Sequence, residues 1–520
     1  MERKSIVSFF VILVIGAFLR LFNLMYFHSL DTDEAIYAQI VFAMTRGYTL
    51  YKDIGFVHPP LYPYIEYPFV LVSPNLWTIR LVNVLLGMAT ICLIFYLSKL
   101  LYSEKIALIA SATYALYPWA IYSNKIALID NGLTFFTILM IYLFAKYLKE
   151  GDVKYLLLSG LFAGISFMTK YTAILFIAAL VLYATVRIFK RRIKHLLLFI
   201  AGAMVFPLAI LVVLLSTGVW PYFFMQSIHW HLIRFGMPLP EKLWFLGQIF
   251  GSLLPLLLIA MPTLHNNIGE WRDELIMSWF FIPLAILSLS KIVFTQYGFS
   301  LMPPISILVA RSVNRYTKSK FSLRTLNLKN VWKGSIVLLT IFILLAYLET
   351  SINLSYGMRW LFFESIVGEE QQGMLLQAQI DTGNYIYDLT NPGDKIWTTE
   401  ASIAFFAQRL IVAPHSEYWR FQGFFQDVWG YGWTPDDYRG PISGYPNGLF
   451  TLHDIQLAWE NEKPKVMVIV NSSWVDYFIW HGINNTYHME EGLADYVQSH
   501  YQLAKTFQSQ NIAVWIRKDI

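Results

Sequence analysis

Three carboxylates lie close together near the start of the chain, at Asp31, Asp33 and Glu34, soon after a long apolar run. At a membrane–water boundary such groups can take a proton from an attacking hydroxyl, or hold a metal ion against a phosphate. The spacing of Asp31 and Asp33 is that of an Asp-x-Asp metal-binding pair, which leaves a divalent metal at these two residues open. The alternative is an ordinary solvated loop, in which acidic residues are common.

A further acidic residue, Asp130, stands at the start of another long apolar run. A carboxylate at membrane depth is costly and is by default a functional candidate. The alternative is a buried structural pair with Lys125 or Arg80. The acidic candidates for catalysis are therefore Asp33, Glu34 and Asp130.

Cationic side chains that could hold a phosphate accompany these acids. Fixed cations lower the barrier when negative charge develops on a leaving group. The candidates are His58, Arg80, Lys125 and Lys170. Lys170 is explained equally well as an anchor at the membrane interface. Arg20 lies near the outer end of the first apolar run, and snorkelling of its side chain to the headgroups explains it as well as a role in the site does.

Tyrosine and histidine side chains add further candidates. Tyr297 is a candidate contact for the donor. It precedes two prolines at 303–304, which we expect to kink a helix beside a lipid groove. His229 and His231 are potential ligands or acceptor contacts, but an interfacial loop helix explains them better.

Long apolar runs must position these residues. The chain is 56% hydrophobic and only 14% charged, which is unlike a soluble globular protein. Roughly eleven runs are long enough to be counted as membrane helices. They lie near 5–26, 77–100, 106–122, 129–147, 154–169, 171–188, 194–217, 245–264, 273–290, 292–311 and 334–352. The first run lacks a small-residue cleavage site, so we predict a retained helix rather than a signal peptide.

Basic residues predict the orientation. They cluster in 190–194, in 311–333 and at the ends of the second and fourth runs, and such clusters favour the cytoplasmic side. With roughly eleven spans and a cytoplasmic N-terminus, the first outer loop 27–76 and residues 353–520 face outside. The net charge of +5 and its position in loops do not suggest nucleic-acid binding. The single cysteine, Cys92, excludes an intrachain disulfide.

Residues 353–520 differ in kind from the apolar residues 1–352. Strand-like runs at Lys395–Thr399, Arg409–Ala413, Lys465–Val470 and Ile512–Arg517, with helix-like stretches near 366–389 and 489–499, predict a small α/β domain. Within it, the segment 415–450 is dense in aromatic residues. Aromatic faces suit sugar rings, so Trp429 and Trp433 are candidates for contacting an acceptor or for a lid, although a core under a long loop also explains them.

Several motifs follow one another in a recognisable order. Asp33-Glu34-Ala is followed by His58-Pro-Pro-Leu, the pair Arg80-Leu81, Asp130, and the string from Gly160 to Tyr171. Over roughly residues 1–350, this order resembles the protein O-mannosyltransferase and aminoarabinose-transferase group of the membrane-embedded C superfamily of glycosyltransferases (GT-C).

The resemblance implies a donor sugar carried on a polyprenyl monophosphate (dolichyl or undecaprenyl) and an acceptor hydroxyl or amine, on a protein, lipid or glycan, outside the membrane. It makes Asp33 the base, with Glu34 completing the motif and Asp130 positioning the acceptor or the base. His58 stands where relatives have Lys before the prolines, near the lipid phosphate. It implies no obligatory cofactor, and leaves a divalent metal open.

Two other function classes remain as alternatives. A lipid or solute transporter or flippase also carries charges in membrane spans, but it places them near the midplane, often in two related halves. Here the charges collect at the outer ends of runs and in outer loops. A non-catalytic glycan-assembly scaffold is the second alternative, and an Asp33 variant that loses transfer but keeps glycan binding would argue against it.

Overall fold

The computed structural model describes residues 3–25, 32–187, 192–233, 236–266, 270–318, 370–412, 415–416, 419–420, 452–470, 493–507 and 512–519. The chain divides into two compact units. The first, here called the helical unit, comprises Met1–Leu24, Asn83–Ile210 and Phe235–Val367. The second, here called the mixed unit, comprises Met25–Val82, Leu211–Arg234 and Gly368–Ile520.

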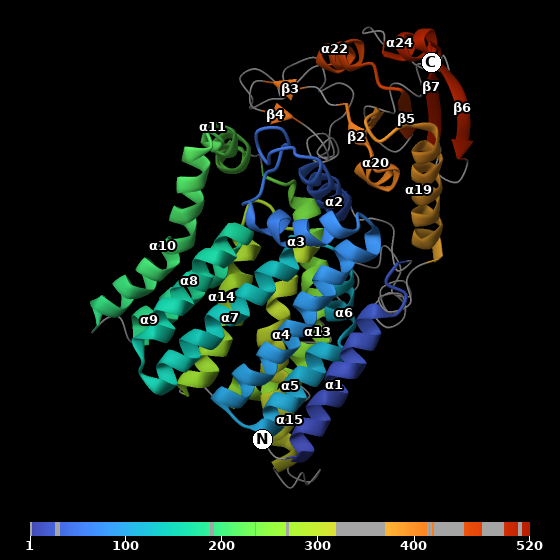
Figure 1. Ribbon diagram of the computed structural model, residues 1–520. Coiled ribbons are helices and arrows are strands. Elements are labelled where there is room, and N and C mark those ends of the chain that lie inside the picture. The colour runs from blue at the N-terminus through green and yellow to red at the C-terminus, as the bar shows by residue number, and fades with distance from the viewer. Residues whose placement is uncertain are drawn as a thin grey trace. The chain divides into compact units, whose positions relative to one another are not determined.

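Helices account for the regular structure described in the helical unit (Figure 1). They are α1 (Arg3–Leu21), most of α4 (Leu76–Leu101), α5 (Glu104–Leu116), α6 (Pro118–Lys125), α7 (Ile129–Glu150), α8 (Val153–Thr169), α9 (Ala173–Arg187), most of α10 (Ile193–Ser216), α13 (Leu239–Asn266), α14 (Trp271–Leu289), the 3₁₀ helix η3 (Thr295–Leu301) and α15 (Met302–Lys318).

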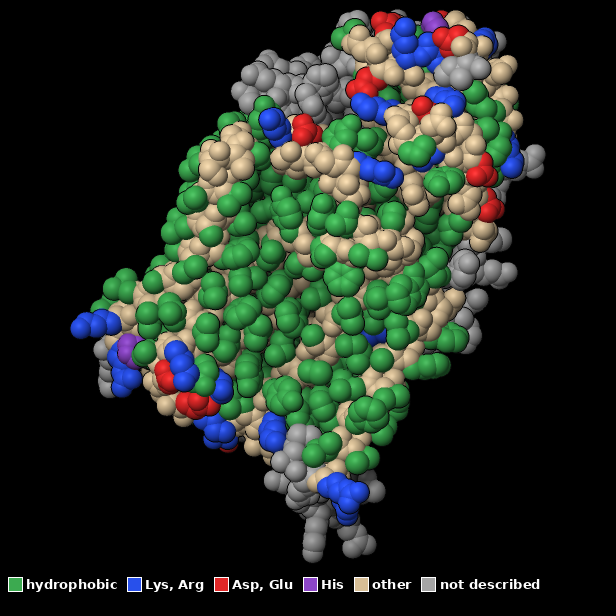
Figure 2. Space-filling view, viewed as in Figure 1, with side chains coloured by type: hydrophobic (Ala, Val, Ile, Leu, Met, Phe, Trp, Pro, Cys, Tyr) green, Lys and Arg blue, Asp and Glu red, His purple; other side chains and the backbone are tan. Residues whose placement is uncertain are grey.

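Except for 106–122, the expected runs from 5–26 to 273–290 each coincide with one helix, while the run 334–352 lies outside the described residues. The expected single helix over 106–122 was wrong, because extended Tyr117 before Pro118 separates α5 from α6. Within the described portion of the chain, five helices are long and apolar enough to cross a membrane: α1, α4, α7, α10 and α13. Hydrophobic side chains cover the middle of the visible face of this unit, and charged ones gather near its lower end (Figure 2). The chain is therefore a mainly helical membrane protein, and the count of eleven spans stays a prediction.

The expected single helix over 292–311 was wrong. Residues 295–301 form the 3₁₀ helix η3, and α15 begins at Met302. Pro303 and Pro304 thus occupy the first turn of α15, where a missing N–H breaks no helical hydrogen bond. The prolines start a helix rather than kink one.

A tight turn joins α7 to α8. Gly151 ends α7 in the left-handed conformation (φ 76°), and the Asp152 side chain accepts a hydrogen bond from Lys154 N at the start of α8. Both are standard signals for the end and the start of a helix. The two helices pack against each other as a hairpin, so the start of α7 and the end of α8 return to the same end of the unit.

Glycines allow α8 and α10 to touch along their backbones. A Cβ added at Gly160 would lie 2.1 Å from Phe199 O, and one added at Gly164 would lie 2.2 Å from Ala203 O. Gly202 meets α8 in the same way, with a Cβ 2.2 Å from Leu157 O. Small residues permit such close helix packing in membranes. The string that begins at Gly160 therefore has a packing role.

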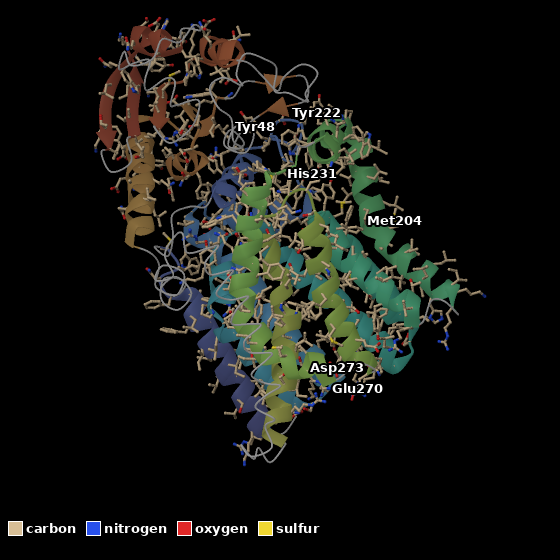
Figure 3. All side chains as sticks on the ribbon, turned by 180° about the vertical axis from the view of Figure 1, so that it is seen from behind. Tyr48, Met204, Tyr222, His231, Glu270 and Asp273 are labelled. Carbon is tan, nitrogen blue, oxygen red and sulfur yellow. The ribbon has the colours of Figure 1, made fainter. Side chains whose placement is uncertain are left out.

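Charged groups fix the start of α14. Asp273, beside Glu270 in Figure 3, is fully buried. It accepts a hydrogen bond from Tyr102 Oη at 2.6 Å and two from Arg311, at 2.9 and 2.6 Å. These bonds join the residue after α4 to α14 and α15, and they satisfy a charge that would be costly if left unpaired.

The mixed unit combines helices of the first loop, a short helical segment and a sheet (Figure 1). Besides the start of α4 and the end of α10, its described helices are α2 (Thr32–Thr45), α3 (Leu61–Val72), α11 (Trp220–Phe223), the π-helix η2 (Phe224–His229), α12 (Trp230–Ile233), α19 (Glu370–Leu389), α20 (Ala401–Ala407), α22 (Leu452–Glu462) and α24 (Leu493–His500). Helix α2 is not an amphipathic surface helix, because Ala35–Met44 are all buried.

The sheet has five strands in the order β2-β1-β5-β7-β6. They are β1 (Lys395–Thr398), β2 (Leu410–Ile411), β5 (Val466–Val470), β6 (Tyr501–Phe507) and β7 (Ile512–Arg517), and a separate pair joins β3 (His415–Ser416) to β4 (Trp419–Arg420). β1 pairs in parallel with β2 and β5, whereas β7 runs antiparallel to β5 and β6. Alternate residues face opposite sides: Ile396 packs with α19 and α20, and Trp397 with Trp459 of α22.

Candidate functional site

The first turn of α2 carries the two acids of the first-loop motif. Asp33 is partly exposed, whereas Glu34 is fully buried. Negative side chains in the first turn are favoured by the helix dipole. Two neighbouring carboxylates on a helix point in directions about 100° apart, so one can face inward while the other faces the accessible side.

Glu34 is held by Arg80, at the start of α4. Arg80 Nε donates to Glu34 Oε1 at 2.8 Å and Nη2 donates to Oε2 at 2.8 Å, with both side chains 0% exposed. Bidentate pairs of this kind fix orientation strongly. Arg80, predicted to bind the donor phosphate, therefore also fixes the start of α2, and its phosphate role stays a prediction.

The loop before the first-loop prolines is shaped by a glutamine from η2. Gln226 Oε1 accepts from Phe56 N at 3.0 Å, and Gln226 Nε2 donates to Tyr51 O at 2.7 Å. Tyr51 has φ +67°, a conformation rare for a residue with a side chain. Gln226 thus pairs with two backbone groups of this loop, as a neighbouring strand would. The sequence analysis missed it.

His58 lies at the end of this loop and is partly exposed. Its carbonyl accepts from Tyr51 Oη at 2.7 Å, and its ring lies 6.0 Å, between centroids, from that of His231. His231 lies on α12, in the short helical segment that also carries Tyr222 (Figure 3). The helical setting expected for His229 and His231 is present, and the structure adds that His231 accompanies His58.

Asp130 and Lys170 form a separate cluster in the helical unit. Lys170 Nζ lies 2.8 Å from Asp130 Oδ1 and 2.7 Å from Oδ2, with both side chains nearly completely buried. The α7–α8 hairpin brings them together. Lys170 Nζ also lies 4.5 Å from the centre of the Tyr297 ring, a distance suited to a cation–π contact.

This geometry corrects two of the alternatives. A structural partner for Asp130 was expected at Lys125 or Arg80, but its ion-pair partner is Lys170, forty residues along the chain. Lys170 was also explained as an exposed interface anchor, yet its side chain is only 4% exposed. Burial with a carboxylate contradicts anchoring in the headgroup layer.

Two more cations cap helix ends in the helical unit. Lys125 Nζ donates to Phe22 O, just after α1, at 2.8 Å. Arg20 is fully buried and donates to Asn124 Oδ1 at 2.9 Å and to Ala115 O, at the end of α5, at 2.9 Å. Snorkelling was therefore the wrong explanation for Arg20, because its guanidinium satisfies carbonyl groups left open at a helix end.

Asp31, Trp429 and Trp433 lie outside the described residues, so their predicted roles stay predictions. Among the residues that the structure describes, no group of three or more His, Cys, Asp or Glu side chains could hold a metal ion. The Asp31–Asp33 pair falls partly outside that set, and the metal at these two residues stays a prediction.

Comparison with known proteins gives matches of two kinds. The family model for dolichyl-phosphate-mannose-protein mannosyltransferase matches residues 57–214, which include His58, Arg80, Asp130 and Lys170. A curated relative, "Putative mannosyltransferase YkcB" from Bacillus subtilis (strain 168), is 26% identical over 178 residues. That alignment covers 32% of this chain and 24% of the relative, so the chain spans about a quarter of the relative's length.

Similarity in structure extends along the whole chain. The crystal structure of ArnT from Cupriavidus metallidurans bound to undecaprenyl phosphate has a TM-score of 0.66 and 15% identity, with 99% of this chain and 98% of that chain covered. The apo state of the same protein gives a TM-score of 0.65 and 14% identity, with 98% of each chain covered. The resemblance inferred from the motifs is confirmed at the level of the fold, and this chain has the fold of the membrane-embedded GT-C glycosyltransferases.

Proposed function

We propose that the protein is a glycosyltransferase that moves a sugar from a polyprenyl monophosphate to an acceptor hydroxyl or amine on a protein, lipid or glycan. The observation that carries the proposal is the difference in environment between the two neighbouring acids at the start of α2. Glu34 is buried and bound at both oxygens by Arg80, while Asp33, the neighbouring residue, is partly accessible. The match over 57–214 and the fold shared with ArnT support it.

In the proposed reaction Asp33 is the general base. Its carboxylate takes the proton from the acceptor oxygen or nitrogen while that atom forms a bond to C1 of the sugar. The bond between C1 and the phosphate oxygen breaks, and the polyprenyl phosphate leaves with the electron pair. Glu34 is the positioning residue of the motif, because its oxygens are occupied by Arg80.

We propose cations from both units as binders of the donor phosphate. His58 of the mixed unit is partly exposed and lies at a loop held in place by Gln226. Lys125 and Lys170 of the helical unit are buried, and Lys170 keeps Asp130 in a fixed position. Tyr297 contacts the Lys170 ammonium, so we propose that it acts through that cation.

The orientation also belongs to the proposal. We propose a cytoplasmic N-terminus, a transmembrane domain over residues 1–352 and an extracytoplasmic domain over residues 353–520, because basic residues near the α7–α8 turn and the start of α10 favour one side. The acceptor is then met outside the membrane, with membrane lipids around the helices. An acceptor or lid role for Trp429 and Trp433 belongs to the same proposal.

The decisive experiment is transfer by the purified full chain in lipid vesicles. Synthetic undecaprenyl- and dolichyl-phosphate sugars are offered with candidate protein, lipid and glycan acceptors, and products are identified by mass spectrometry. We expect a product heavier by one sugar, together with released polyprenyl phosphate. Movement of intact lipid-linked sugar across the bilayer without any transfer would support the flippase alternative instead. Parallel reactions with EDTA determine whether a divalent metal is needed.

A further inference from the structure

After its first turn, where Arg80 holds Glu34, helix α2 is apolar on nearly every side, so packing alone specifies the rotation of this later part weakly. Residues Ala35–Met44 are all buried, and apart from the hydroxyl of Tyr37 only Gln39 among them carries a polar side chain. A helix that is apolar all round packs in many rotational settings of similar energy, whereas a single buried polar group can select one setting.

Gln39 connects α2 to the end of α20. Its Nε2 donates to the carbonyl oxygen of Arg409 at 2.9 Å, and both residues belong to the mixed unit, in which α2 packs on α20. Among the described residues, no group donates to Gln39 Oε1, which is buried. A buried acceptor without a donor is unfavourable by about 1–3 kcal/mol, so packing alone does not favour glutamine here.

Arg409 is a fixed point for this contact. Its Nε donates to Thr390 Oγ1 at 2.8 Å, and its Nη2 donates to the Thr390 and Tyr387 carbonyls at 2.6 and 3.2 Å. Its Nη1 donates to the Ala407 and Gln408 carbonyls. The guanidinium, whose pKa burial lowers, thus locks the end of α19 to the end of α20. The Arg409 carbonyl is held where these two helices end beside the sheet.

Resting on the proposed function, we infer that Gln39 is a second positioning residue for Asp33: the Glu34–Arg80 pair holds the first turn of α2, and Gln39 holds the rest of the helix against the end of α20, so that both contacts set the direction of the general base. Gln39 follows Asp33 by six positions, about 9 Å along one rigid helix. Because a side-chain carboxylate lies roughly 6 Å from the helix axis, a rotation of α2 by about 10° moves it by about 1 Å. A misplacement of that size can lower a rate about a hundredfold.

Gln39→Leu tests the inference, because it removes the hydrogen bond and the unsatisfied acceptor together while nearly keeping the volume. We expect kcat to fall at least tenfold, KM for the undecaprenyl-phosphate sugar to change less than twofold, and the apparent melting temperature in detergent not to fall. Hydrogen exchange of the backbone amides of residues 33–38 should become faster. A purely structural role for Gln39 predicts loss of melting temperature without this split between kcat and KM.

Thr390→Val provides a second, indirect variant, because it loosens Arg409 without touching α2. We expect a smaller fall in kcat, and a double variant with Gln39→Leu that is no slower than Gln39→Leu alone, since both act through one contact. Gln377→Leu, an exposed glutamine on α19 paired with Asp381, is the matched control and should keep wild-type kcat.

The outcomes separate this inference from the proposed function. If Asp33→Asn is inactive but Gln39→Leu keeps kcat within twofold of wild type, the positioning role is overturned and the function stands. If Asp33→Asn keeps transfer, Asp33 is not the base and the positioning role falls with it. If the wild-type chain transfers no sugar, the proposed function fails. Unchanged exchange at residues 33–38 in Gln39→Leu contradicts the positioning role without reference to activity.

Discussion

Arg80 and Glu34 form a fully buried ion pair in which two guanidinium nitrogens each bond one carboxylate oxygen at 2.8 Å. Forty-six residues separate them, and the pair ties the start of α4 to the first turn of α2. The acid next to Glu34 therefore projects from a helix end whose position is fixed.

Breaking this buried pair should destabilise the protein more than breaking a partly exposed ion pair. Glu34→Ala leaves a buried guanidinium without its counter-charge, so we expect a loss of about 3 kcal/mol or more in unfolding free energy. Thermal unfolding in detergent, followed by intrinsic fluorescence, measures it. Glu462→Gln, which breaks the half-exposed pair with Lys395, is the matched control and should change the melting temperature little. Equal shifts in the two variants would show that Arg80 is not dependent on Glu34.

Asp130 and Lys170 predict a different pattern. Asp130→Asn and Lys170→Met each leave one buried partner without its ion pair, so both should express poorly and unfold at lower temperature. The double variant removes both charges and should recover the melting temperature. It should not recover transfer if the pair serves the reaction. Recovery of both stability and transfer would assign the pair a structural role only.

The glycine contact between α8 and α10 predicts a steric effect. Gly164→Val places side-chain atoms against the Ala203 carbonyl, where even a Cβ would lie 2.2 Å away, so we expect a loss of about 1–3 kcal/mol or more. Gly247→Ala on α13 meets nothing within 4 Å and is the matched control. Size-exclusion profiles and melting temperatures of the two variants compare them directly. Equal melting temperatures in the two variants would mean that α10 can move away from α8.

The proposed orientation predicts where the C-terminus lies. Alkaline phosphatase fused after Ile520 should be active in intact cells, because it folds only outside the cytoplasm, whereas a fusion within the basic segment 190–194 should be inactive. Green fluorescent protein at the same two positions should give the opposite pattern. A C-terminal fusion that is fluorescent with green fluorescent protein and inactive with alkaline phosphatase would mean that the number of spans was miscounted.

Much of the architecture was predictable because it depends on local signals. Apolar length located the helices, and Gly151 with Asp152 marks the α7–α8 turn. Strand-like runs located β1, β2, β5 and β7, but β6 was missed, because five of its seven residues are exposed and carry no alternating apolar pattern. The helices α20 and α22 were missed as well.

The candidate site residues were proposed from their residue types, whereas their contacts were not predicted. Asp33, Glu34, His58 and Asp130 stand out by residue type at the ends of apolar runs. Pairings across long stretches of chain, such as Glu34 with Arg80 and Asp130 with Lys170, have no signal in local spacing. Gln39 and Gln226 were missed for a related reason: each is a single amide whose function depends on the backbone group it meets in the folded chain.

The central claim is that Asp33 removes the acceptor proton, and single-turnover transfer by Asp33→Asn tests it most directly. Asparagine keeps the shape but cannot act as the base, whose help is typically worth about a hundred- to ten-thousandfold in rate. With Glu34→Gln, Asp130→Asn and wild type measured in parallel on one undecaprenyl-phosphate sugar, we expect Asp33→Asn to lose transfer by at least a hundredfold, while keeping donor binding and melting temperature, and Glu34→Gln to lose less. Transfer retained by Asp33→Asn but lost by Asp130→Asn would contradict the account and make Asp130 the base.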